Sequence, residues 1–215
     1  ELSVEQAFEE IINFAKISKN GADYAKNAIN EADSDKFEEL RKKLVKYEEI
    51  SDRIEYEIAT FLNKVSAEEI SESTSVKIKA MYKIIGELES LGDSGETLSR
   101  ILSRKNIHKK EFDSESIKNL NAMADAVSAT YDVMIENLTA AHKGELVEIS
   151  NAYNAEDRLN TLRNNLRDSM IENIDSKGDN YQASVYFIDI INTYEQMGDF
   201  MINISQDLER AFIKK

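Results

Sequence analysis

A short acidic segment that contains a glycine occurs twice in this chain. Residues 89–93 (Glu-Ser-Leu-Gly-Asp) are echoed by residues 195–199 (Glu-Gln-Met-Gly-Asp), 195 − 89 = 106 positions later in a chain of 215 residues. Each copy places two carboxylates four residues apart, which puts them on the same face of a helix. Such a pair repels itself unless a cation or a basic group neutralises it, so cation binding is the chemistry that these residues favour.

A comparable pair, Glu48 and Asp52, lies on the helical segment before the first copy. Antiparallel packing would bring it beside Glu89 and Asp93 and give four carboxylates on one face. A site made only of oxygen ligands suits hard cations such as Mg²⁺, Ca²⁺, Mn²⁺ or iron. A solvated acidic face is the competing interpretation, because the chain has 41 acidic residues.

The second copy has a weaker partner. On the segment before it, Tyr153 stands four residues before Asp157, and the nearest glutamate, Glu156, is followed four residues later by Asn160. The two copies are therefore not equivalent. If the chain holds a single cluster, we expect it at Asp93.

Composition indicates an all-α protein. The chain has no proline and seven glycines, and its apolar residues recur at helical spacing. It has no cysteine, which rules out disulfides and thiolate metal sites, and no apolar run long enough to span a bilayer. The formal net charge of −14 argues against a nucleic acid or an anionic membrane surface as the main partner, because both would repel it.

Six helices of about 30 residues can be placed by this spacing. They cover about 3–31, 34–65, 66–104, 114–141, 145–174 and 180–213, and the third is expected to open with the capping box Ser66-Ala67-Glu68-Glu69. Short connections make neighbours antiparallel. We therefore predict two tandem antiparallel three-helix bundles related by duplication, over residues 1–106 and 107–215. Gly92 and Gly198 would lie inside helices, where glycine costs about 1 kcal/mol relative to alanine, so they hint at a close neighbour.

The combination of these features resembles the PhoU family of phosphate-transport regulators. The resemblance rests on Glu-X-X-Gly-Asp in a third helix, Glu-X-X-X-Asp in the helix before it, and a duplicated three-helix unit. Members of that family bind clusters of iron or other metals through such motifs. Carried over by motif, the resemblance implies metal ligands at these positions: Glu48, Asp52, Glu89, Asp93, Glu195 and Asp199.

Among relatives, the chain is similar to the PhoU-like domain at the C-terminus of bacterial sodium/phosphate cotransporter II-related membrane proteins. That similarity implies a soluble, non-enzymatic regulatory domain of a sodium-dependent phosphate transporter, on the cytoplasmic face of the membrane. The implied partners are the membrane domain, in the same polypeptide, and a second copy of the chain in a homodimer. The cofactors implied are divalent or ferric cations.

Two alternatives stay open. One is a stand-alone PhoU-type regulator of phosphate uptake or signalling. The other is a Mg²⁺-dependent all-α nucleotide pyrophosphohydrolase, because the segment 68–72 (Glu-Glu-Ile-Ser-Glu) followed by Glu89 and Asp93 matches the pattern of those enzymes. That chemistry requires the two acidic segments to converge, whereas residues 73–88 are predicted to form continuous helix. Glu72 and Glu89 would then lie about 25 Å apart, which disfavours the enzyme.

Overall fold

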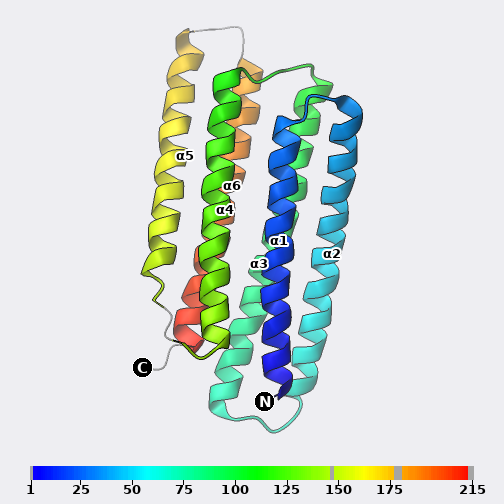
Figure 1. Ribbon diagram of the computed structural model, residues 1–215, viewed down its shortest axis with the longest axis vertical. Coiled ribbons are helices and arrows are strands. Elements are labelled where there is room, and N and C mark those ends of the chain that lie inside the picture. The colour runs from blue at the N-terminus through cyan, green and yellow to red at the C-terminus, as the bar shows by residue number, and fades with distance from the viewer. Residues whose placement is uncertain (1, 146–147, 177–180, 213–215) are drawn as a thin grey trace.

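Six long helices run side by side and alternate in direction (Figure 1). The computed structural model describes residues 2–145, 148–176 and 181–212. The bounds of the helices are α1 Leu2–Asn30, α2 Ser34–Ser66, α3 Glu72–Ile107, α4 Ser114–His142, α5 Ser150–Ser176 and α6 Tyr181–Phe212. The prediction of an all-α fold made of two three-helix bundles is confirmed.

The predicted start of the third helix is wrong. The Ser66 hydroxyl donates a hydrogen bond of 2.8 Å to the Leu62 carbonyl, so Ser66 closes α2 rather than opening α3. Ser71 caps α3 instead, because its hydroxyl accepts a hydrogen bond from the Thr74 amide. The helical pattern alone could not separate two serines that are both suited to a helix start.

The fifth helix also begins later than predicted, at Ser150 rather than Glu145. Gly144 adopts a positive φ of 72°, the left-handed conformation that glycine tolerates. The amides of Gly144 and Glu145 donate to the carbonyls of Ala141 and Ala140, which completes the end of α4. The connection predicted between residues 174 and 180 falls partly in α5, which reaches Ser176, and residues 177–179 lie outside the described residues.

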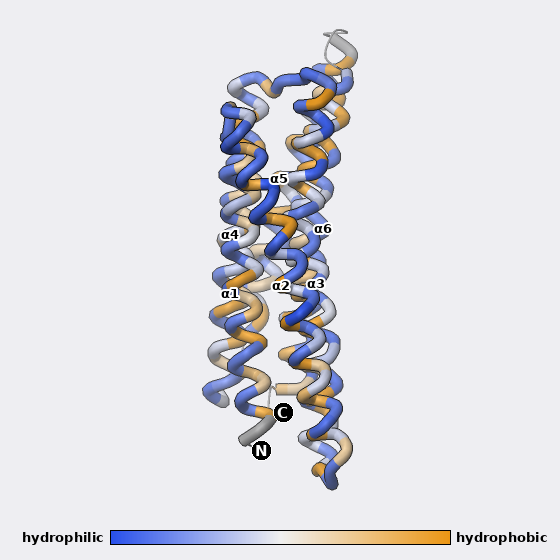
Figure 2. The backbone as a smooth tube through the Cα atoms, turned by 90° about the vertical axis from the view of Figure 1, so that its right-hand side faces the viewer, coloured by the Kyte–Doolittle hydropathy of each residue, from blue (hydrophilic) through white to orange (hydrophobic). Residues whose placement is uncertain are grey.

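The two halves pack against each other along their whole length. Within each half, every helix packs on the other two. Between the halves, α1 packs on α4 and α3 packs on α6. Hydrophobic positions recur along each helix in Figure 2, and buried residues from both halves form one hydrophobic cluster. The boundary predicted after residue 106 falls at the last residue of α3, and the division into two units stays a prediction.

Polar contacts fix the α1–α4 seam. The hydroxyls of Ser18 and Tyr131 are buried and lie 2.7 Å apart. At the edge of the same seam, the ammonium of Lys26 lies 2.6 Å from the carboxylate of Asp125. Because both contacts join residues about a hundred positions apart, they tie the first half to the second.

Gly92 and Gly198 lie at close approaches between helices, as their helix-interior positions suggested. A Cβ atom on Gly92 would lie 2.2 Å from Ser51 Oγ and 2.7 Å from Ser51 Cβ, so α2 and α3 could not keep their separation. A Cβ atom on Gly198 would lie 2.6 Å from Leu159 Cδ2. The neighbour is a side chain of the preceding helix in both cases.

We expect Gly92→Ala to destabilise the fold by about 1–3 kcal/mol, because the strain of overpacking against Ser51 exceeds the helix propensity that alanine gains. Gly86→Ala in the same helix is the matched control. Its Cβ would meet nothing within 4 Å, so it should stabilise the protein by up to about 1 kcal/mol. Urea unfolding measures both changes, and equal effects at the two positions would contradict the close approach.

Candidate metal centre

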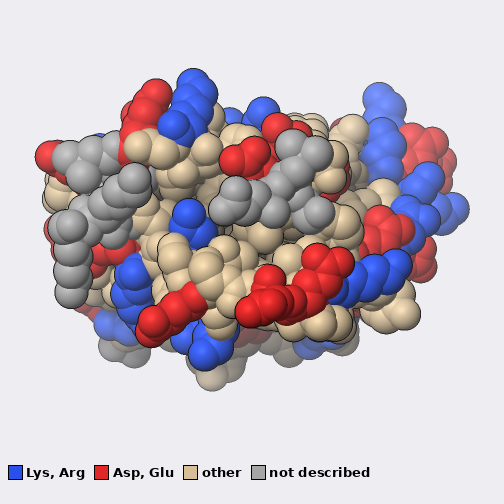
Figure 3. Space-filling view, turned by 90° about the horizontal axis from the view of Figure 1, so that it is seen from below, with Lys and Arg blue, Asp and Glu red and all other residues tan. Residues whose placement is uncertain are grey.

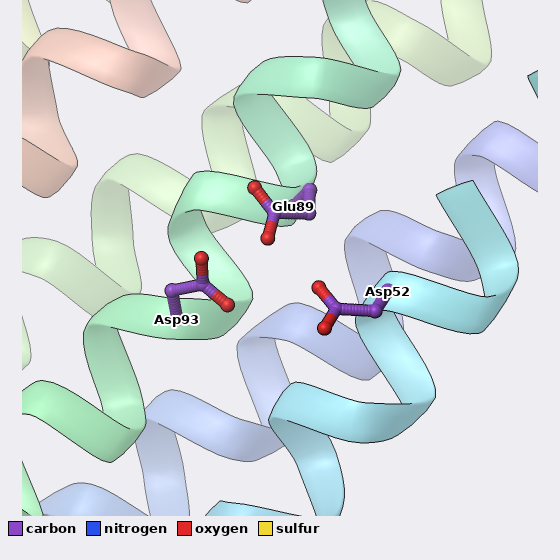
Figure 4. A group of neighbouring side chains, drawn as sticks. All are labelled: Asp52, Glu89 and Asp93. Atoms are coloured by element: carbon purple, nitrogen blue, oxygen red, sulfur yellow. The ribbon is translucent and has the colours of Figure 1, made fainter. Parts of the chain in front are cut away.

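Three carboxylates converge between α2 and α3. Asp52 of α2 and both Glu89 and Asp93 of α3 point toward one another (Figure 4), and one oxygen of each lies within 4.8 Å of the other two. Asp52 is exposed, whereas Glu89 and Asp93 are partly buried. Among the residues that the structure describes, no other group of three acidic or histidine side chains meets this distance.

The predicted packing of Glu48 and Asp52 beside the third helix is reproduced. Asp93 and Asp52 raise the pKa of Glu48 electrostatically, after the larger effect of burial. Glu48 thus lies at the edge of the cluster, although it is not one of the three residues whose oxygens converge.

Two further acidic residues, Glu55 and Glu96, belong to the same surface and were missed by the sequence analysis. Each lies three residues after an aspartate of the cluster, so α2 and α3 both carry the pattern Glu-X-X-X-Asp-X-X-Glu. Both could have been found from the sequence, because residues three positions apart lie on the same face of a helix. Glu96 also pairs with Arg100 at 2.8 Å, so part of its charge is already neutralised.

The cluster strongly resists full ionisation. Burial raises the pKa of Glu89 to about 9, and the neighbouring carboxyls of Asp93, Asp52 and Glu55 contribute to that rise. The pKa of Asp93 is also raised, mainly by burial and then by the charges of Asp52 and Glu96. Both effects disfavour the charged form, and a bound cation would reverse them.

A hard cation fits this donor set. Asp93 Oδ1 is buried and has no hydrogen-bond partner among the described residues, which leaves an acceptor directed at no donor. Carboxylate oxygens from two helices offer the ligands that Mg²⁺, Ca²⁺, Mn²⁺ and iron take in proteins.

In the second half, Glu195 and Asp199 of α6 face a different residue of α5 from the one expected. Asp199 and Glu195 both raise the pKa of Glu156, after the larger effect of burial. Tyr153 instead accepts a hydrogen bond of 3.1 Å from Gln206, and Asp157 is exposed. The counterpart of Glu48 is therefore Glu156, which lies three residues after Tyr153. Tyr153 and Asp157 were thus the wrong pair to set against Glu48 and Asp52.

No family model matches the sequence, and no curated protein matches it either. The crystal structure of PhoU from Pseudomonas aeruginosa is similar with a TM-score of 0.83 at 13% identity, over 97% of this chain and 96% of that chain.

The fold is that of PhoU. The phosphate transport system regulatory protein PhoU from Streptococcus pneumoniae is also similar, with a TM-score of 0.80 at 13% identity, over 100% of this chain and 99% of the other. The PhoU fold therefore accounts for the whole chain, and the resemblance inferred from the duplicated motifs is confirmed for the fold.

The pyrophosphohydrolase alternative finds no support in this arrangement. The acidic segments of the pyrophosphohydrolase pattern do not converge, because α3 runs without a break from Glu72 to Ile107. The histidines lie elsewhere: His108 Nδ1 is 2.6 Å from the Tyr186 hydroxyl, and His142 Nε2 is 3.4 Å from Glu9.

None of the described helices combines the length and the apolar character that crossing a bilayer would require.

We expect the metal-free protein to lose stability as pH rises from about 4.5 to 9. The folded state holds a proton on Glu89 up to about pH 9, whereas the unfolded chain releases it near its ordinary pKa of 4.5. The folded state thus binds more protons throughout this window, so its stability is greatest below it and declines through it. Glu89→Gln should flatten the slope.

Urea unfolding at a series of pH values, in the presence of a chelator, measures this slope. Glu57→Gln is the matched control, because Glu57 is an exposed glutamate of α2 outside the cluster. If Glu89→Gln and Glu57→Gln have the same pH dependence as the wild-type protein, Glu89 does not carry the effect.

Proposed function

We propose that this protein is a PhoU-type regulator of phosphate transport, and that it acts by binding a transport protein rather than by catalysis. The observation that carries the proposal is the fold: two PhoU structures match it over nearly their whole length as well as its own. The duplicated acidic-glycine segments, which suggested the same family, occupy matching places in α3 and α6.

The stand-alone form of this regulator has the better support. The two similar structures are PhoU proteins, and this chain covers 96% and 99% of their lengths. Neither of these two structures is of a domain attached to a sodium-dependent phosphate transporter, which is the form that the sequence suggested first. In either form the proposed site of action is the cytoplasmic face of the membrane, beside a phosphate transporter.

Cations at the α2–α3 cluster are the second part of the proposal. Asp52, Glu89 and Asp93 would hold the ion, with Glu48 at the edge. A bound Mg²⁺, Mn²⁺, Ca²⁺ or iron ion supplies positive charge, which lets these carboxyls ionise without mutual repulsion. The protein residues meanwhile keep the oxygens converging, because Gly92 lets the two helices approach closely.

The proposed mechanism is electrostatic. Ion binding replaces protons and exposed negative charge on the α2–α3 face by a metal–carboxylate group. A change of this kind regulates transport only if the regulator then binds two transporter states with different affinity. A basic partner surface suits a chain with a net charge of −14, although acidic and basic side chains lie together at the end seen in Figure 3. The face formed by α2 and α3, where the cluster lies, is the proposed docking face.

We expect Mn²⁺ or Mg²⁺ to raise the melting temperature of the wild-type protein. A free ion concentration of 100 times the dissociation constant stabilises by about 2.7 kcal/mol, which corresponds to roughly 5–10 °C for a chain of this size. Asp93→Asn should abolish the rise, because it removes the negative charge of the carboxylate that carries the buried acceptor oxygen. Glu57→Gln is the control and should keep it; no shift with Mg²⁺, Mn²⁺ or iron in the wild-type protein would refute the metal site.

The regulatory claim has its own measurement in cells. We expect cells that lack the protein to show altered uptake of radiolabelled phosphate when phosphate is abundant, because the restraint on a transporter is lost. Re-expression of the wild-type chain should restore uptake, and Asp93→Asn should restore it only in part. Identical uptake with and without the protein would refute regulation while leaving the metal site intact.

A further inference from the structure

The second half contains a site that corresponds to the metal centre residue by residue. Gly92 approaches Ser51 in the first half, and Gly198 approaches Leu159 in the second. These contacts fix the register: Leu159 stands 159 − 51 = 108 positions after Ser51, and Gly198 stands 198 − 92 = 106 positions after Gly92. The same offsets apply to the residues on either side of each contact.

Three of the six acidic residues are replaced at the corresponding positions. Glu48 is matched by Glu156, but Asn160 stands for Asp52 and Arg163 for Glu55. On α6, the counterparts of Glu89 and Asp93 are acidic, whereas the counterpart of Glu96 is an isoleucine: Glu195, Asp199 and Ile202. The second site therefore keeps three carboxylates and gains one guanidinium.

The guanidinium of Arg163 lies beside one of these carboxylates, that of Glu195. Arg163 Nη2 is 4.0 Å from Glu195 Oε1, and the two side chains are only 19% and 21% exposed. Arg163 Nη1 also donates a hydrogen bond of 3.4 Å to the Asn192 side chain. Among the ion pairs of the described residues, none joins Arg163 to α4, the other helix packed on α5.

The electrostatics agree with this geometry. Burial and then the charge of Asp199 raise the pKa of Glu195, and the charge of Arg163 offsets part of that rise. A hydrogen bond with Asn160 lowers the pKa of Glu156 in the same way. Arg163 and Asn160 thus offset part of the rise in the second half, whereas the neighbouring carboxyls of Asp93, Asp52 and Glu55 all raise the pKa of Glu89 in the first.

We propose that Arg163 takes the place of the cation in the second half, where its ion pair with Glu195 is permanent and where Glu195 and Asp199 hold no metal. The proposal rests on the cation binding proposed for the first half, which it confines to that half. It reverses the expectation that Glu195 and Asp199 are metal ligands.

The two kinds of counter-ion differ in what they can respond to. A guanidinium stays protonated at every physiological pH and cannot dissociate from the chain. A metal ion leaves when its concentration falls, and it competes with protons for the carboxylates. The α5–α6 seam is therefore constant, and only the α2–α3 seam responds to cations. A metal ion entering the second site would also meet the positive charge of Arg163 and one carboxylate fewer at Asn160.

Mn²⁺ binding, measured by calorimetry and by metal analysis after dialysis, tests the proposal. We expect Asp93→Asn to lose binding at least tenfold, because the second half contributes none. In that background, Asn160→Asp with Arg163→Glu should restore binding by recreating the acidic pattern of α2 on α5. Binding that survives Asp93→Asn and is lost in Asp199→Asn would overturn the proposal, as would a failure of the restored pattern to bind while wild-type protein binds.

A second test needs no metal and separates this proposal from the proposed function. In chelator, Arg163→Gln should shift the urea midpoint downward more at pH 8 than at pH 5, because at pH 8 the unpaired carboxylates are ionised. Arg163→Lys should recover part of the loss, and Arg158→Gln, an exposed arginine of the same helix, is the matched control. Equal shifts at both pH values would overturn the ion pair. If the shift appears but wild-type protein binds no metal, the proposed cation site fails and the Arg163 pairing stands.

Discussion

The close approach of α2 and α3 at Gly92 is the constraint on which the rest of the acidic surface depends. Ser51 packs where a side chain at position 92 would otherwise lie. Because Asp52 follows Ser51 and Asp93 follows Gly92, the same contact brings their carboxylates together. Helix packing therefore works against electrostatic repulsion, and the protein needs protons or a cation to relieve it.

A proton and a metal ion cannot both neutralise the same carboxylate of the cluster at the same time. A carboxyl that ligates a metal must release its proton, so a site whose residues have raised pKa values binds metal more tightly as pH rises. Glu89 is the extreme case, with a pKa raised to about 9. At neutral pH the metal-free cluster thus keeps at least one proton, which the proposed metal binding would displace. The charge of the cluster would then depend on cation supply and on acidity together.

Sequence reasoning located the fold and the first acidic pair because both depend on local spacing. Helical periodicity and the absence of proline determine where long helices lie, and carboxylates four residues apart share a face wherever the helix packs. It failed where two helices had to be set in register across a connection. The span from Asp52 to Glu89 is 89 − 52 = 37 positions, and that from Asn160 to Glu195 is 195 − 160 = 35. Only the packed contacts at Ser51 and Leu159 reveal this difference of two residues, which is why Glu156 and Arg163 were not recognised as counterparts.

The packing of the two halves decides where the difference between their acidic sites can affect the structure. The two helices that carry the glycine-aspartate segments, α3 and α6, lie directly against each other, and their buried residues belong to one core. A cation that changes the charge of the α2–α3 seam therefore acts on a helix whose other side is held by a half with its own fixed counter-ion, Arg163. Close-packed interiors adjust little, so the response should be confined to the outer face formed by α2 and α3. That face, rather than the α5–α6 face, is where a cation-dependent partner would distinguish the two states.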